Sequence, residues 1–166
     1  MKMPSTRRVS HALALLVVAI AALLSTAALG DAAPKTDSAA LTPAQWAKIL
    51  KRMGSSGDTR VLPAKVAAHL GLTKGAETFT VHELAFEREG YQHGIYHSLD
   101  PKDDRVILAF RTPEKKWTAF LTNTRFKLVS AIVWNAGDEP APWPASESLP
   151  AFNNELVYWS VLADLF

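Results

Sequence analysis

The central part of the chain, residues 79–134, alternates between apolar and polar side chains, and turn residues interrupt the alternation at short intervals. A period of two is typical of β-strands with one face on a core and the other in water. The turn signals stand at Glu89-Gly90, Asp100-Pro101-Lys102-Asp103, Pro113-Glu114-Lys115-Lys116 and Thr124-Arg125. The pattern predicts an antiparallel meander of four to five strands. Residues 126–134 could instead form a helix, but their β-branched and aromatic content favours a strand.

The turn positions also predict how the strands pair. The expected neighbours are His82 and His97, Leu84 and Ile95, Phe86 and His93, Ile95 and Leu108, Leu108 and Leu121, Phe110 and Ala119, and Leu121 and Leu128. This register gathers large apolar side chains on one face: Leu84, Phe86, Ile95, Val106, Leu108, Phe110, Trp117, Leu121, Leu128 and Ile132. The second face collects Glu83, Glu87, Gln92, Arg111, Thr118, Thr122 and Lys127. It also holds Ile107, Ala109, Phe120, Val129 and Val133, so we expect part of it to be covered.

Two helices are predicted before the meander. In the first, Thr42 is the N-cap, Pro43 and Gln45 complete its first turn as a capping box, and Gly54 ends it. An apolar stripe runs along that helix: Trp46, Ile49, Leu50 and Met53. A second, shorter helix spans residues 63–70, and Gly71 follows it as the C′ residue.

A third helix is predicted at the end of the chain, after a proline-rich surface connector over residues 135–150. Ser148 is the expected N-cap, and the helix runs through Leu165 with apolar residues nearly all round. We therefore predict an α+β domain over residues 42–166, with all three helices on the same face of the sheet.

The N-terminus reads as an export signal. Basic residues precede the apolar run Ala12 to Leu24, and small residues follow it up to Gly30. Cleavage is expected after Gly30, with Ala28 or Ala32 as alternatives, and residues 31–41 read as a linker. We expect an exported protein, periplasmic or secreted, without stable membrane insertion. The alternative is a periplasmic domain held by an uncleaved N-terminal anchor.

Removal of the signal changes the charge balance. Three of the 18 Lys and Arg lie in residues 1–30, and none of the 16 Asp and Glu do, so the mature chain carries 15 basic and 16 acidic side chains, a net charge of −1. This balance argues against nucleic acid as a partner. The chain has no cysteine, which excludes disulfides, thiolate metal ligands and a cysteine nucleophile.

The histidines are the strongest candidates for chemistry. His93 and His97 are four residues apart, but on a strand that separation is about 13 Å, too far for one ion. His82 and His97 are expected opposite each other, and with Asn123 nearby they could line a small polar pocket. The ordinary interpretation is that these histidines lie at the rim of a core, each hydrogen-bonded. We predict no metal site and no cofactor.

The sequence contains no specific catalytic motif. It favours a non-catalytic binding or interaction module, inhibitor-like or accessory, with a protein as a candidate partner. Aromatic residues near the C-terminus offer a candidate partner surface: Trp143, Tyr158, Trp159 and Phe166. The alternative from another class is a small hydrolase or metal-dependent enzyme with a pocket at His82 and His97.

Overall fold

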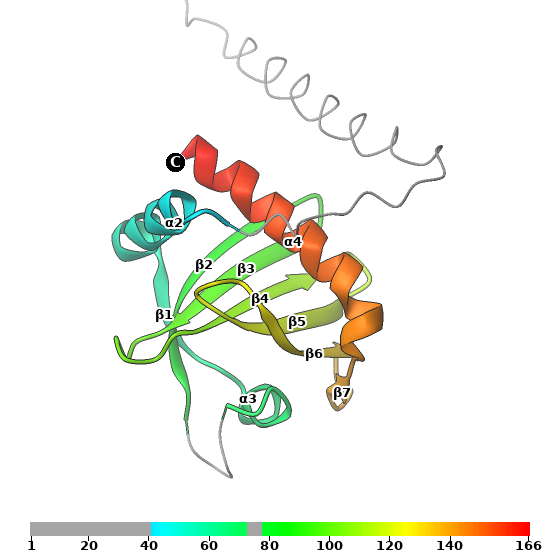
Figure 1. Ribbon diagram of the computed structural model, residues 1–166. Coiled ribbons are helices and arrows are strands. Elements are labelled where there is room, and N and C mark those ends of the chain that lie inside the picture. Colours follow the sequence, from blue (N-terminus) through cyan, green and yellow to red (C-terminus); the bar gives the residue numbers. More distant parts are fainter. Residues whose placement is uncertain (1–40, 73–77) are drawn as a thin grey trace, which may run out of the picture. The chain divides into compact units, whose positions relative to one another are not determined.

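A seven-stranded antiparallel sheet forms the centre of the domain, with its strands in the order of the sequence (Figure 1). The computed structural model describes residues 41–72 and 78–166. The predicted signal peptide over residues 1–30 and nearly all of the predicted linker lie outside the described residues. The helices are α2 (Pro43–Ser56), α3 (Ala64–His69) and α4 (Ala145–Leu165). The strands are β1 (Asp58–Val61), β2 (Thr80–Arg88), β3 (Tyr91–Ser98), β4 (Arg105–Arg111), β5 (Lys116–Asn123), β6 (Leu128–Asn135) and β7 (Ala141–Pro142).

The α+β class and the antiparallel sheet are confirmed, but the predicted number of strands is wrong. Strands β2 to β6 correspond to the five predicted strands, and residues 128–135 form a strand rather than a helix. The two edge strands were not predicted. β1 has only four residues, all exposed, and β7 has only two, so neither shows a period that marks it as a strand.

The register of the first two hairpins is confirmed. His82 pairs with His97 and Leu84 with Ile95, and Ile95 pairs in turn with Leu108. Glu89 and Gly90 both have positive φ at the tip of the first hairpin, as a type I′ turn requires.

The predicted register between β4 and β5 is wrong by one residue. Phe110 pairs with Thr118, not with Ala119, and Leu108 pairs with Phe120. The loop holds three residues rather than four, because Lys115 takes a positive φ of 63° and its N–H bonds to the carbonyl of Thr112. A type I turn followed by one left-handed residue is the common three-residue hairpin.

A one-residue slip reverses the faces of a strand. Trp117, Leu121 and Ile132 therefore lie on the opposite face from the one predicted, while Phe120 belongs to the core on the face of Leu84 and Leu108. The predicted pairing of β5 with β6 is also wrong by one residue. Leu128 pairs with Thr122, not with Leu121, at a point where the register of the two strands shifts. As expected, the second face is partly covered, because Ile107 and Ala109 are buried there.

The helices cover both faces of the sheet, not one (Figure 1). Helices α2 and α4 pack on one face through Ile49, Met53, Leu156 and Trp159. Helix α3 packs on the other through Ala67, in a second core that includes buried residues of β2 to β6. The prediction that all three helices lie on the same face was wrong, because the chain passes through the edge strand β1 between α2 and α3. Among the described residues, no helix is both long enough and apolar enough to cross a membrane.

The helix ends follow the predicted caps only in part. The capping box of Thr42 and Gln45 is present, and Gly71 has a φ of 76° after α3. However, α2 continues through Gly54 and ends at Gly57. Helix α4 begins three residues before the expected N-cap, and Ser148 is fully buried inside it, where its hydroxyl bonds to the carbonyl of Ala145.

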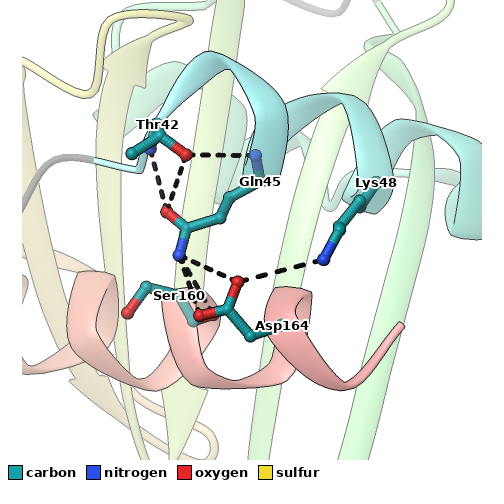
Figure 2. Close-up of polar contacts among 5 residues, drawn as sticks. All are labelled: Thr42, Gln45, Lys48, Ser160 and Asp164. Carbon is teal, nitrogen blue, oxygen red and sulfur yellow. Dashed lines mark hydrogen bonds and ion pairs between the residues drawn. The ribbon is translucent and has the colours of Figure 1, made fainter.

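The capping box also joins α2 to α4 (Figure 2). The Oε1 atom of Gln45 accepts a hydrogen bond from the backbone N–H of Thr42 at 3.0 Å. The same amide donates through Nε2 to both carboxylate oxygens of Asp164 at 3.3 Å and to the carbonyl of Ser160 at 3.4 Å. Lys48 lies 4.0 Å from the Asp164 carboxylate. The Gln45 side chain thus both caps the start of α2 and joins α2 to α4.

Replacing Gln45→Glu should separate these two roles. Glu keeps the acceptor for the cap but faces the Asp164 carboxylate, so we expect the free energy of unfolding to fall by up to about 1 kcal/mol, less at high salt. Urea unfolding of Gln45→Glu and of the double variant with Asp164→Asn measures this. The double variant restores an amide opposite a carboxylate and should regain the loss; equal stability of all three proteins would contradict the contact.

Candidate functional site

A groove of about 560 Å³ lies on the α3 face of the sheet. Its walls come from β1, the start of α3, residues of β2 to β6 on this face and the connector between β6 and β7. Pockets of this volume, lined mainly by apolar atoms with a few polar groups, are the usual form of small-molecule sites.

The register explains why this face is hollow. Gly94, Ala109 and Ala119 pair in sequence across β3, β4 and β5, so a row of small residues crosses the sheet. A row of larger residues flanks it on each side. One contains Glu83, Tyr96 and Ile107, and the other contains Gln92, Trp117 and Trp134. Of the residues named here, all except Gly94 line the groove.

Tyr96 leans from its own row across the row of small residues. A Cβ atom built on Gly94 would lie 2.5 Å from the hydroxyl oxygen of Tyr96 and 2.8 Å from two of its ring carbons. The phenol ring therefore occupies the space that any larger residue at position 94 would need. Burial raises the pKa of Tyr96, and the nearby Arg60 guanidinium lowers it to a smaller extent.

Charged groups gather at the end of the groove near β1. The guanidinium Nε of Arg60 forms an ion pair with Oε2 of Glu83. The Glu83 side chain is only 5% exposed, whereas that of Arg60 is 58% exposed. A buried carboxylate thus anchors an exposed cation beside Tyr96. A second ion pair, between Lys65 and Glu139, joins α3 to the connector between β6 and β7.

A stacked ladder forms the wall at the other side of the groove. The indole rings of Trp117 and Trp134 are nearly parallel, at 7°, with centroids 5.9 Å apart. The Arg111 guanidinium lies 5.5 Å from the Trp117 ring centroid. Its Nη2 is 3.8 Å from Glu87, and its Nε is buried with no partner among the described residues. Such cross-strand stacking stiffens a sheet surface.

The histidine pair lies on the opposite face of the sheet. His82 and His97 are directly opposite each other, and the Trp46 ring packs edge-on against His97 with centroids 5.6 Å apart. Burial lowers the pKa of His97, with Asp103 raising it to a smaller extent.

Asn123 does not lie beside the histidines. It pairs with Arg105 on β4, and its Oδ1 accepts hydrogen bonds from the backbone N–H groups of Arg125 and Lys127 at 3.0 and 3.4 Å. Its side chain organises the turn that follows β5. The structure therefore brings together two of the three residues in the predicted pocket.

Within residues 41–72 and 78–166, no three His, Asp or Glu side chains form a group that could hold a metal ion. The metal-dependent hydrolase centred on His82 and His97 stays a prediction. Replacement of His82→Ala, together with metal analysis of the purified protein, tests that prediction.

A contact between a partly buried histidine and a buried carboxylate was not predicted. His93 Nδ1 lies 2.9 Å from Glu155 Oε1, and this contact joins β3 to α4. The Tyr158 ring stacks on the imidazole with centroids 3.9 Å apart. Burial raises the pKa of Glu155, and His93 lowers it to a smaller extent. The sequence placed His93 on the core face, but nothing in it identified Glu155 as the partner.

The predicted C-terminal partner surface is largely occupied by internal contacts. Trp159 is fully buried, and Trp143 packs on the core 6.1 Å from Phe120. Phe166 stacks on Phe86 and is 40% exposed. Tyr158 is half-buried against the imidazole of β3.

The groove residues were not predicted as a site. The predicted register places Trp117 on the other face, and it places Glu83 among the polar residues of the second face. The usable signal was the set of small residues, Gly94, Ala109 and Ala119, at equivalent positions in successive strands. This signal becomes visible only with the correct register of β5.

Comparison with known proteins gives no family. The chain matches no protein-family model, and no significantly similar chain was found among curated proteins or among solved structures.

Replacing Glu155→Gln should change the pH dependence of stability. The folded pKa of Glu155 is raised, so the contribution of its carboxyl group to stability is complete below the unfolded value, about 4.3, and is lost as the pH rises through the folded value. Relative to Glu155→Gln, the wild type should therefore lose stability from about pH 4 upward. Urea unfolding at several pH values measures this. The exposed Glu147→Gln on the same helix is the control, and parallel curves for wild type and Glu155→Gln would exclude the raised pKa.

Replacing Gly94→Ala should displace the Tyr96 ring. The added methyl group has no room, and we expect the free energy of unfolding to fall by about 1–3 kcal/mol. The matched control is Gly54→Ala, at a helical position where nothing lies within 4 Å of the new Cβ; it should stabilise the protein by about 0.5–1 kcal/mol. Thermal unfolding compares the two, and a neutral Gly94→Ala would show that the ring does not lie there.

Proposed function

We propose that the protein is exported, to the periplasm or outside the cell, and acts as a non-catalytic binding protein that holds a small ligand in the groove on the α3 face. The observation that carries this proposal is the groove itself, a row of small residues between two rows of larger ones. The Tyr96 ring fills the space over Gly94, whereas Ala109 and Ala119 line the groove. Sheets that serve only as a core fill such positions with larger side chains, because an unfilled hollow forfeits packing energy.

The polar groups of the groove support binding rather than catalysis. Glu83 is already engaged by Arg60, and no histidine lines the groove. The groove therefore offers apolar and aromatic walls with a few fixed polar groups, which is the composition that recognises a ligand by shape and one anchoring contact.

Binding of an uncharged fluorescent probe tests this function. The fluorescence of N-phenyl-1-naphthylamine should increase on saturable binding of one probe per chain. Ala109→Leu replaces a methyl group on the floor of the groove with an isobutyl group and should weaken binding at least tenfold. Ala68→Leu, at an exposed position on α3 outside the groove, should leave it unchanged.

The fold of both variants is checked by thermal unfolding. If the wild type does not bind the probe, or if Ala109→Leu binds it as tightly as Ala68→Leu does, the groove is not the binding site.

A further inference from the structure

We infer that the ligand is an amphipathic monocarboxylate, an acid with one flexible apolar chain whose carboxylate binds at Arg60. This inference rests on the proposed function, because it names the ligand class of the same groove. Three features of the groove carry it: the charge at one end, the shape, and the absence of polar groups along the floor.

The Arg60 guanidinium provides the positively charged donor group for the carboxylate of the ligand. Its contact with Glu83 is made through Nε, and 58% of its side chain stays exposed. A guanidinium presents its donors as a planar fork that matches a carboxylate. Because Glu83 is buried and anchored on β2, it fixes the direction of the fork. The Tyr96 side chain also lines the groove, and it is close enough to Arg60 for the guanidinium charge to act on the phenol.

The shape of the groove fits a single chain. The lining runs from Arg60 on β1 to Trp134 on β6, and neighbouring strands are about 4.8 Å apart, so the groove is roughly 24 Å long. A volume of about 560 Å³ over that length gives a mean cross-section of roughly 23 Å². That cross-section accommodates one extended chain and is too narrow for two chains side by side.

The floor of the groove favours an aliphatic chain over a peptide. The side chains of the small row, Ala109 and Ala119, carry no polar atom, and the backbone groups of these strands are paired within the sheet. A peptide would place an amide group at every residue against this floor without partners, which is costly. An alkyl chain has no such groups. The groove is lined by only two cations, Arg60 and Lys65, and Lys65 forms an ion pair with Glu139 outside the lining, so one anchoring fork remains rather than a row of cations.

Displacement of bound N-phenyl-1-naphthylamine tests the ligand class with the full chain. The competitors are saturated monocarboxylates of increasing length and the n-alkanols of the same lengths. Affinity should rise about fourfold for each CH₂ group that the groove buries and then reach a plateau. At equal length the acid should bind at least tenfold more tightly than the alcohol, because only the acid makes the charged contact.

Variants at position 60 test the anchor. Arg60→Ala should weaken the acids about 10- to 100-fold and leave the alkanols unchanged. Because Arg60→Ala leaves the buried Glu83 unpaired, the double variant with Glu83→Gln is measured as well and should show the same selective loss. Lys127→Ala, a basic residue outside the groove, is the matched control.

Equal binding of acids and alkanols would overturn the ligand class. So would tighter binding of a peptide with an apolar C-terminal residue than of any monocarboxylate. In either case, probe binding that Ala109→Leu still abolishes would leave the proposed function intact. A wild-type protein that binds no probe would instead remove the function together with the ligand class.

Discussion

The cross-strand register of the sheet decides everything that the two faces of this protein can do. Neighbouring strands place directly opposed residues on the same face, so one pairing fixes the direction of every side chain in both strands. The pairing of β4 with β5 is set by a single left-handed residue, Lys115, in a three-residue loop. That residue directs Phe120 into the core beneath α4 and Trp117 toward the groove.

The two faces are built differently because the helices that cover them differ. α2 and α4 are long, and their apolar stripes, including Ile49, Leu156 and Trp159, cover most of one face. α3 has six residues and buries only Ala67 within its own span, so it covers part of the other face. The row of small residues lies on this partly covered face, where the short helix leaves the groove accessible at its edge. A buried polar contact between His93 and Glu155 holds α4 in place on the closed face.

The sequence predicted the elements well where a strong local signal was present. The period of two located β2 to β6, the Glu89-Gly90 turn set the first register, and the capping box of Thr42 located the start of α2. Short edge strands carry no period, so β1 and β7 were missed. The β5 register depended on one residue with positive φ, and a lysine gives no signal for that conformation.

The candidate site could be predicted only in part for the same reason. His82 and His97 were correctly paired, but the groove requires Ala119 and Trp117 on the face of Gly94, which the predicted register reversed. The Arg60 and Glu83 contact could not be found either, because it joins the unpredicted β1 to β2.

The most direct measurement is nuclear magnetic resonance mapping of a saturated monocarboxylate on the isotopically labelled protein. We expect the largest changes at the backbone amides of Ala109 and Ala119 and at the indole N–H groups of Trp117 and Trp134, with Trp46 and Trp143 on the other face unchanged. Changes centred on Trp143 and Tyr158, with none at the row of small residues, would contradict a ligand site on the α3 face.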